Sequence, residues 1–152
     1  GTAGNQEGLA LLRDAGVHAA FSHADPDHCS QILAHTGGAG VNVIVEMLAN
    51  VNLENDAAIL AMGGRIVVVG NRGSINFTPR LLMAKESAVL GMALWNISPA
   101  DYGACLAGVA AALESGAVRP VVGKEYALAD AAQAQIDILG SSARGKMVLK
   151  ID

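Results

Sequence analysis

The clearest pattern of apolar and polar positions lies in residues 41–73. Residues 41–48 are almost entirely apolar, which is typical of a parallel strand that helices bury on both faces. Apolar residues then recur at helical spacing from Leu53 to Ala61, and we expect the glycine pair at 63 and 64 to end this helix. Residues 65–70 repeat the buried-strand pattern. The stretch therefore predicts one βαβ unit, with residues 41–48 as a central strand.

We expect function at the ends of these two strands, because open α/β sheets bind ligands beyond the carboxyl ends of their strands. The ends fall in the loops 49–53 and 69–73. In the first loop, Asn50 and Asn52 are interpreted most simply as caps of the following helix, although either side chain could contact a ligand. The second loop places Arg72 between glycines. It is either an ordinary surface turn with a solvated arginine or a place where backbone and guanidinium meet a ligand.

The rest of the chain alternates between helices and strands. Residues 1–4 resemble the end of a strand and a turn, so we expect the chain to begin inside a domain. Caps and glycine stops predict helices at residues 6–15, 26–36, 79–86, 99–116 and 128–139, and apolar runs predict strands at 17–21, 87–94, 119–123 and 145–151. A stripe that includes Tyr102, Leu106 and Val109 is expected to face inward from the longest helix. The last elements break the alternation, and we expect them in a different sheet.

Composition narrows the class of protein. Of the 152 residues, 52% are hydrophobic and 16% are charged, as expected of a globular α/β protein. The net charge of −4 without a basic tract argues against nucleic acid as the main ligand. No apolar run approaches the roughly 20 residues of a membrane span and no signal peptide is visible, so we expect a soluble, cytoplasmic protein. Cys29 and Cys105 each fall on the apolar face of a predicted helix, so we expect buried, reduced thiols.

A few other features bear on chemistry. The glycine cluster at residues 37–40 joins a helix to a strand, whereas a phosphate loop must join a strand to a helix, so we reject it. His23 follows a predicted strand, where it either stays in solvent, the simpler interpretation, or meets a nucleotide base. Glu46 interrupts a buried strand, so it either pairs locally or lines the crevice with a shifted pKa. The other histidines lack metal-ligand spacing, and we predict no metal site and no catalytic triad.

Three motifs in a fixed order indicate a family. EMLANVNL, VVVG-x-RG and MAKES follow one another in the stretch EMLANVNLENDAAILAMGGRIVVVGNRGSINFTPRLLMAKESAVLGMAL. At this spacing the stretch closely resembles zeta-crystallin-type NADPH:quinone oxidoreductases of the medium-chain dehydrogenase/reductase superfamily, and the likeness extends more loosely from GTAG to GKMVL. The resemblance implies a Rossmann-type, doubly wound parallel α/β sheet truncated on its N-terminal side, without the first strand, its glycine-rich loop and most of the second strand.

The resemblance also implies the division of the chain and its site. Residues 1–117 would form a partial NADP-binding Rossmann domain, and residues 118–152 a C-terminal segment that returns to the catalytic domain. No catalytic residue is implied. Residues 1–6 contain no Asp or Glu, which is compatible with NADP rather than NAD, although Glu7 follows closely. The family's NADPH contacts, all after strand ends, would fall on Gly4, His23, Asn52, Val69, Gly70, Asn71, Arg72, Met92, Ala93 and Leu94.

The implied function is a zinc-independent, NADPH-dependent quinone reductase in which NADP(H) carries the reducing equivalents to a quinone or related small molecule. An enone or enal reductase of the same superfamily is the nearest alternative. A non-catalytic nucleotide- or RNA-binding protein, or a structural crystallin-like protein, is the alternative from another class. We expect a homodimer through the strand from Ser87 to Leu94. We expect the chain alone to be inactive, because it would lack the pyrophosphate loop and most of the quinone pocket. The strand at 17–21 would also have no bridge to residues 41–48, unless the two pair directly, exchange with a second chain or keep an associated upstream fragment.

Overall fold

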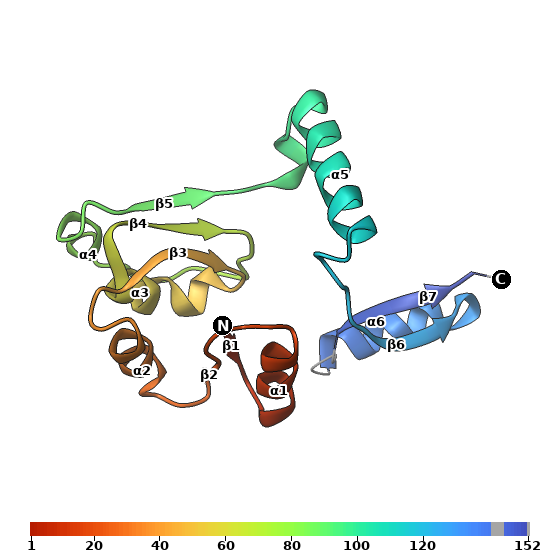
Figure 1. The fold of residues 1–152 in the computed structure, drawn as a ribbon, viewed down its shortest axis with the longest axis horizontal. Helices are drawn as coiled ribbons and strands as arrows, with labels where there is room; N and C mark the ends of the chain where they lie inside the picture. Colours follow the sequence, from red (N-terminus) through yellow and green to blue (C-terminus); the bar gives the residue numbers. More distant parts are fainter. Residues whose placement is uncertain (141–144, 152) are drawn as a thin grey trace.

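The computed structural model describes residues 1–140 and 145–151, in which helices alternate with strands (Figure 1). Short 3₁₀ turns, η1 (Leu94–Asn96) and η2 (Leu128–Asp130), follow two of the strands. The other elements, in chain order, are β1 (Thr2–Ala3), α1 (Gln6–Asp14), β2 (Phe21–Ser22), α2 (His28–His35), β3 (Val41–Glu46), α3 (Ala49–Ile59), β4 (Leu60–Val68), α4 (Arg80–Met83), β5 (Ala88–Gly91), α5 (Pro99–Glu114), β6 (Val122–Ala127), α6 (Ala131–Gly140) and β7 (Lys146–Lys150).

The strands pair in parallel within the described part of the chain, in three separate sheets. β1 pairs with β2, β3–β4–β5 form the central sheet, and β6 pairs with β7. Glu46 of β3 lies opposite Val68 of β4, which lies opposite Gly91 of β5, so the three central strands end together. Parallel strands connected through helices confirm the predicted α/β class. The expectation that the last elements belong to a different sheet is confirmed as well.

The hydrophobic core lies between the central sheet and the helices α3 and α4. Ala57, Leu60 and Ile66 have at most 1% of their surface exposed. Burying a side chain the size of Leu60 or Ile66 stabilises a fold by about 1.5–3 kcal/mol. The surrounding partly buried residues are Ile44, Leu53, Val68, Phe77, Leu81, Leu82 and Val89. This core fixes β3, β4 and α3 relative to one another, and the ends of these elements carry the predicted site.

The helix of the βαβ unit ends earlier than the sequence predicts. α3 stops at Ile59, before the expected glycine pair. The ammonium group of Lys85 explains the difference, because its Nζ donates to the carbonyl oxygens of Ala58 at 2.6 Å and Leu60 at 2.5 Å, where the helix ends. Gly63, with a φ of +67°, lies instead in an irregular part of β4, where the pairing with β3 shifts register.

The prediction that residues 41–48 form a central strand buried on both faces is wrong for this structure. Among residues 1–140 and 145–151, β3 pairs only with β4. Val43 and Val45 are 50% and 64% exposed, whereas Glu46 on the other face is buried. Side chains alternate between the two faces of a strand, and α3 packs against one face of β3. β3 is therefore an edge strand of the central sheet, open on the side that faces β1.

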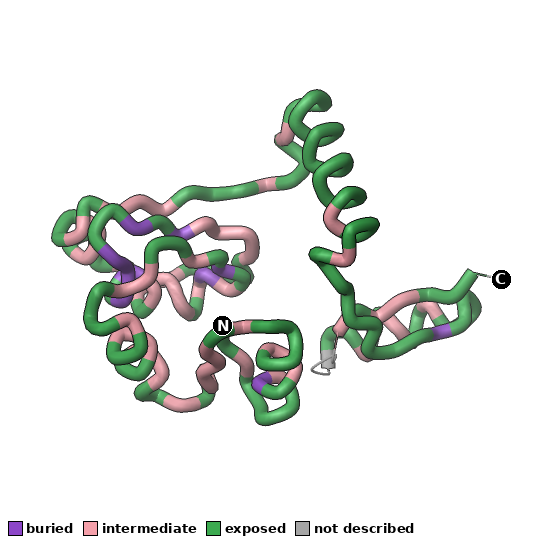
Figure 2. The backbone as a smooth tube through the Cα atoms, viewed as in Figure 1, coloured by how far each residue is buried: buried purple, intermediate pink, exposed green. Residues whose placement is uncertain are grey.

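The longest helix is exposed, contrary to the predicted inward stripe. α5 contains no buried residue (Figure 2), and Leu106 and Val109 are 52% and 56% exposed. Cys105 is also exposed, so the expectation of two buried thiols fails for this residue and holds only in part for Cys29, which is half-buried. The physical reason is that α5 stands apart from the central sheet at the end of an extended connection (Figure 1).

Predicted caps are confirmed, whereas several strand boundaries differ. Asn5 Oδ1 accepts from the Gly8 N–H at 2.8 Å, and Ser98 Oγ accepts from the Asp101 N–H at 3.1 Å, so α1 and α5 begin where predicted. The predicted strands at 17–21 and 87–94 shorten to β2 and β5, and the one at 119–123 begins later, at Val122. Strand ends depend on ladder partners, which the local pattern does not specify.

Candidate functional site at the carboxyl ends of the strands

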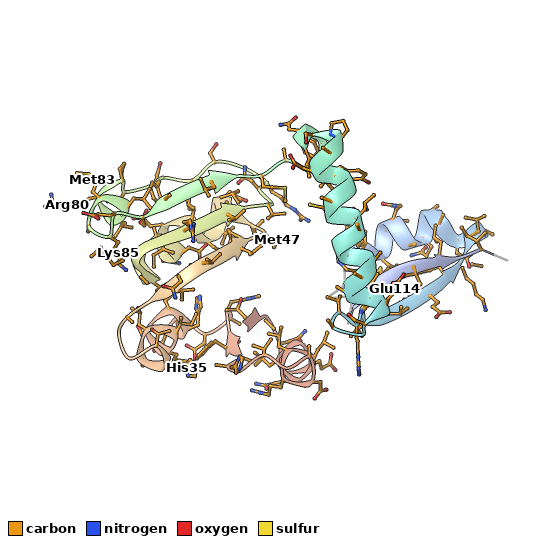
Figure 3. The ribbon with its side chains drawn as sticks, turned by 45° about the horizontal axis from the view of Figure 1, so that its top comes forward. His35, Met47, Arg80, Met83, Lys85 and Glu114 are labelled. Atoms are coloured by element: carbon orange, nitrogen blue, oxygen red, sulfur yellow. The ribbon has the colours of Figure 1, made fainter. Side chains whose placement is uncertain are left out.

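The shared end of the central strands brings separate loops together. Met47, directly after β3, lies at the opposite end of the sheet from Arg80, Met83 and Lys85 (Figure 3). The loops after β4 and β5 leave the sheet at the same edge as Met47, because the register aligns the last residues of the three strands. This is the edge at which the topological rule expects a ligand.

Backbone hydrogen bonds join the loops after β3 and β4. The N–H groups of Val69 and Gly70 donate to the Glu46 carbonyl at 2.8 and 3.2 Å, and the Ala49 N–H donates to the Gly70 carbonyl at 3.0 Å. A Cβ atom added to Gly70 would overlap the backbone carbonyl of Met47. Gly70 is therefore required for the close approach of the two loops, which is a structural reason for a glycine that the sequence suggested only as a ligand contact.

Asn50 extends this connection with its side chain. Its Oδ1 accepts from the Arg72 backbone N–H at 2.8 Å, while Asn71 Nδ2 donates to the Gly73 carbonyl at 2.8 Å. The predicted helix-capping role of Asn50 is replaced by one that fixes the neighbouring loop. Arg72 itself is exposed, so its backbone is held while its guanidinium group faces solvent.

Two acidic residues, Glu46 at the end of β3 and Asp56 on α3, lie close together, the first buried and the second half-buried. Glu46 is 6% exposed, and its Oε1 accepts from the Leu48 backbone N–H and from Asn52 Nδ2, the latter at 3.0 Å. Burial first, and then a hydrogen bond with Glu46 and the negative charge of Glu46, together raise the pKa of Asp56 to about 7. Of the alternatives for Glu46, local pairing is confirmed, and it also lines a cavity.

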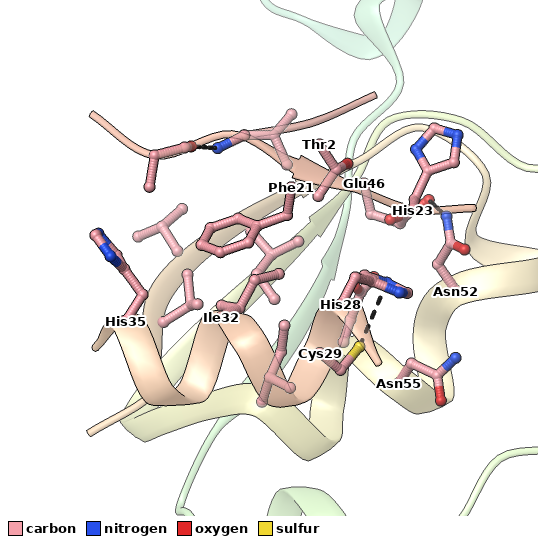
Figure 4. A pocket seen from close by; sticks show the side chains of 18 of the residues that line it. Thr2, Phe21, His23, His28, Cys29, Ile32, His35, Glu46, Asn52 and Asn55 are labelled. Carbon is pink, nitrogen blue, oxygen red and sulfur yellow. Dashed lines mark hydrogen bonds between the residues drawn. The ribbon is translucent and has the colours of Figure 1, made fainter. Parts of the chain in front are cut away.

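Two cavities open near this edge. The first, of about 480 Å³, lies between β1–β2 and β3, with α2 and α3 lining it; His23, Glu46 and Asn52 are at one end and His35 is at the other (Figure 4). The second, of about 400 Å³, lies beyond β4 and β5 and is lined by Val68, Val69, Gly70, Asn71, Gly91, Met92, Ala93 and Asn96. The open edge of β3 thus borders the first cavity, and the glycine loops border the second.

The residues predicted to contact the cofactor divide between these cavities. His23 and Asn52 line the first, and Gly4 lies against His23, since a Cβ atom on Gly4 would be 2.9 Å from His23 Nε2. The second cavity brings together Val69, Gly70, Asn71, Met92 and Ala93. Arg72 and Leu94 line neither cavity.

Sequence reasoning missed Asp56 and Asn96. A signal existed for Asp56, because it follows Asn52 by four residues on the same helix and therefore shares its face. No comparable pattern marks Asn96, which lies in η1 and borders the second cavity. A polar residue in a short turn after a strand has no characteristic spacing.

The cysteine that borders the first cavity is not an activated nucleophile. Cys29 Sγ lies 3.4 Å from His28 Nε2 (Figure 4). His28 Nδ1 lies 2.7 Å from the Asp25 carbonyl oxygen. Burial raises the pKa of the Cys29 thiol, and the charge of Asp56 adds to the effect, so the protonated form is favoured. Within residues 1–140 and 145–151, no group of three or more His, Cys, Asp or Glu side chains could hold a metal ion.

Solved structures identify the class of fold. An NAD-dependent alcohol dehydrogenase superposes with a TM-score of 0.87 at 23% identity, over 99% of this chain and 43% of that protein. A quinone oxidoreductase of Pseudomonas syringae pv. Tomato DC3000 gives a TM-score of 0.86 at 21% identity, over 98% of this chain and 47% of that protein. At these identities the likeness concerns the fold alone. The chain shares the Rossmann-type α/β fold of these structures.

The family follows from the sequence. The profile of the zinc-binding dehydrogenase family matches residues 15–149, and this chain belongs to that family. A quinone oxidoreductase of Rattus norvegicus is 45% identical over 150 residues, which are 98% of this chain and 46% of that protein. The resemblance drawn from the three motifs is thereby confirmed. The chain spans about half the length of the curated relatives it matches. None of the helices described is long and apolar enough to cross a membrane.

Proposed function

We propose that this chain supplies part of the NADP(H)-binding face of a quinone reductase, which transfers reducing equivalents from NADPH to a quinone. The observation that carries the proposal is that residues expected to contact the dinucleotide border two cavities at the carboxyl ends of the strands. The 45% identity to a protein named quinone oxidoreductase supports the choice of substrate class. When bound, the dinucleotide supplies the reducing equivalents, and the residues described here hold and orient it.

The second cavity fits a neutral part of a dinucleotide. Its lining combines backbone near Gly70 and Gly91 with the amide side chains of Asn71 and Asn96, and it includes no charged side chain. A Cβ atom added to Gly91 would meet nothing within 4 Å, so there is free space beside the end of β5. Carboxamides and ribose hydroxyls both exchange hydrogen bonds with such a lining.

We expect the phosphate groups of the dinucleotide to contact Arg72, which lies outside the second cavity. Arg72 lies in an exposed loop whose backbone Asn50 holds in place, so its guanidinium group can meet a phosphate without disturbing the fold. The first six residues contain no Asp or Glu that would repel a 2′-phosphate, which supports NADP over NAD.

We also propose that residues 1–117 and 118–152 belong to different domains. The separate β6–β7 sheet supports this division. Within that sheet, α6 packs beside both strands, and Tyr126, 7% exposed, donates from its hydroxyl to Asp137 Oδ2 at 2.6 Å. Limited proteolysis tests the division, and cleavage is expected between α5 and β6 before any cut within the central sheet.

A homodimer through the strand from Ser87 to Leu94 remains part of the proposal. In the part of the chain that the structure describes, β5 pairs only with β4; Leu90 of β5 and Met92 just after it are 48% and 45% exposed. An open strand edge with apolar side chains is a surface that proteins usually cover. Sedimentation of the protein at micromolar concentration should give a dimer, and Leu90→Lys should shift it to a monomer. A monomeric wild type would exclude this interface.

The chain alone is expected to be a poor reductase. β1 pairs with β2, so β2 keeps one neighbour, but neither strand pairs with β3 across the first cavity. Within the described residues, the backbone groups along the facing edges of these strands are therefore unpaired. The residues after β2 and β3 that are expected to contact the cofactor are not held in one sheet. NADPH oxidation by the purified 152-residue chain should stay near the background rate with a quinone present. Turnover similar to that of the rat relative would contradict this expectation.

A chimera tests the function itself. In it, this chain replaces the matching 150 residues of the rat quinone oxidoreductase. We expect the chimera to oxidise NADPH with 1,2- and 1,4-quinones faster than with enones or enals. Preference for enones would favour the alternative reductase. A folded chimera that binds NADPH but reduces neither class would support the non-catalytic alternative.

A further inference from the structure

Glu46 is a buried acidic residue whose hydrogen-bond partners lie in helix α3 and at the residue just before it. It is 6% exposed at the end of an otherwise apolar strand, and its burial requires donors. Leu48 is the residue just before α3, and Asn52 and Asp56, four residues apart, lie on the same face of that helix. Leu48 donates through its backbone and Asn52 through Nδ2. The third position, Asp56, has a buried Oδ2 with no hydrogen-bond donor among the described residues.

The chemistry of Glu46 decides how the Asn52 amide is turned. An ionised carboxylate only accepts hydrogen bonds, so the NH₂ group of Asn52 must face Glu46 and its Oδ1 must face away. Both residues line the first cavity, and Figure 4 shows them at the same end as His23. An asparagine that could otherwise offer either group is thereby restricted to one.

We propose that Glu46 and Asp56 are positioning residues, which fix the Asn52 amide so that the site presents a hydrogen-bond acceptor to a bound dinucleotide. The identity of the ligand rests on the proposed function. The group that Oδ1 recognises is a hydrogen-bond donor of that ligand, either a ribose hydroxyl or the NH₂ of the nicotinamide carboxamide. A donor-free group at this position is disfavoured, because it would leave Oδ1 without a partner.

Asp56 takes part through its proton. While protonated, it can donate to Glu46, which leaves Glu46 ionised and able to hold Asn52. Once Asp56 is ionised, two adjacent carboxylates repel each other and weaken the hold on the amide. The titratable groups nearby on the same cavity are Cys29 and His28 of α2 and His23 after β2. Cys29 stays protonated, so the charge that opposes Asp56 most directly is that of Glu46.

Nuclear magnetic resonance of the 152-residue chain tests the positioning without any ligand. The side-chain amide protons of Asn52 should exchange slowly and should shift with a midpoint near pH 7, where Asp56 titrates. Glu46→Met removes the acceptor, so exchange should become fast. Asp56→Asn keeps a donor that does not titrate, so slow exchange should persist without the pH-dependent shift. Glu114→Met on the exposed helix α5 is the matched control.

Two outcomes of this measurement would overturn the proposal. One is slow exchange of the Asn52 amide in a folded Glu46→Met variant. The other, decisive even if Glu46→Met fails to fold, is an Asn52 shift that titrates in Asp56→Asn as it does in the wild type.

Calorimetry with NADP⁺ and its 3-acetylpyridine analogue, which lacks the carboxamide NH₂, tests what the acceptor recognises. Glu46→Met should weaken NADP⁺ binding about fivefold to tenfold, and Glu114→Met should not. If the carboxamide is the donor, the wild type prefers NADP⁺ and the variant loses that preference. If a ribose hydroxyl is the donor, both ligands weaken equally. Unchanged affinities in Glu46→Met would overturn the proposal. Failure of the wild type to bind either ligand counts against the proposed function, and the amide exchange then decides the positioning.

Discussion

The helices α3 and α5 show how differently two apolar helical sequences can be used. α3 buries Ala57 and Ile59 against the central sheet, and its first turns carry the contacts that join the loops of the site. α5 is longer and richer in apolar residues, yet it buries none of them. The difference lies in what covers each helix, since α3 packs on β3 and β4 while α5 stands apart (Figure 2). An apolar stripe therefore predicts a surface that needs a partner, not the partner itself.

The largest expected difference between the two regions is in the stability lost when a large apolar side chain is replaced by alanine. Ile66→Ala should lower the free energy of unfolding by about 2–5 kcal/mol, because Ile66 is fully buried and its removal leaves a cavity. Leu106→Ala on α5 should change it by less than about 0.5 kcal/mol, because Leu106 is 52% exposed. Urea unfolding followed by circular dichroism measures both. Similar losses would mean that α5 is covered in solution.

Two glycine substitutions should move stability in opposite directions. Gly70→Ala should destabilise the chain by about 1–3 kcal/mol, because the added Cβ overlaps the Met47 carbonyl and separates the two loops. Gly103→Ala in α5 meets open space in a helix interior, so it should stabilise that helix by about 0.5–1 kcal/mol. Thermal unfolding and helix content report the two effects. A neutral Gly70→Ala would show that the loops can part without cost.

The sequence predicted elements better than it predicted their surroundings. The caps Asn5 and Ser98 act through residues three positions away, so the local pattern contained the information. The end of α3 could not be predicted from the local pattern, because Lys85, which is distant in sequence, donates the hydrogen bonds to the carbonyl oxygens at that end. The exposure of Val43 and Val45 depends on what lies beside β3, which periodicity cannot report.

Some features of the candidate site could likewise be predicted from the sequence, whereas others could not. Positions after strand ends, such as His23 and Asn71, could be named from topology and family resemblance. The partnership between Glu46 and Asp56 required three dimensions, because a strand residue and a helix residue meet only after the chain turns. Gly70 was predicted to contact the cofactor. The structure shows that it also lies against the Met47 backbone, which no single-residue pattern reveals.

Substitutions at the two ends of the central sheet should differ in their effect on cofactor affinity. In the chimera, Arg72→Ala should weaken NADPH binding by about 1–3 kcal/mol if the guanidinium contacts a phosphate. Its stability should not change, because the Arg72 side chain is exposed. Arg80→Ala, an exposed arginine at the opposite end of the sheet (Figure 3), is the matched control and should leave affinity unchanged. Calorimetric titration measures both, and an unaltered dissociation constant for Arg72→Ala would remove this residue from the site.

A smaller effect than that of the core truncation is the pH dependence of stability that Asp56 confers on the well-packed region. The pKa of this acid is raised in the folded chain from its ordinary value of 3.8 to about 7. A raised pKa means that the folded state holds the proton more tightly than the unfolded state does. The stabilisation is therefore fully present below about pH 4 and is lost as the pH rises to about 7.

Asp56→Asn isolates this contribution, because all other titrating groups are common to both proteins. Relative to the variant, the wild type should lose about 1–2 kcal/mol of stability between pH 4 and pH 7, a value reduced because Asp56 is partly exposed and water screens its charge. Urea unfolding at a series of pH values gives the difference directly. A difference that stays constant from pH 4 to pH 8 would mean that Glu46 and Asp56 do not share a proton.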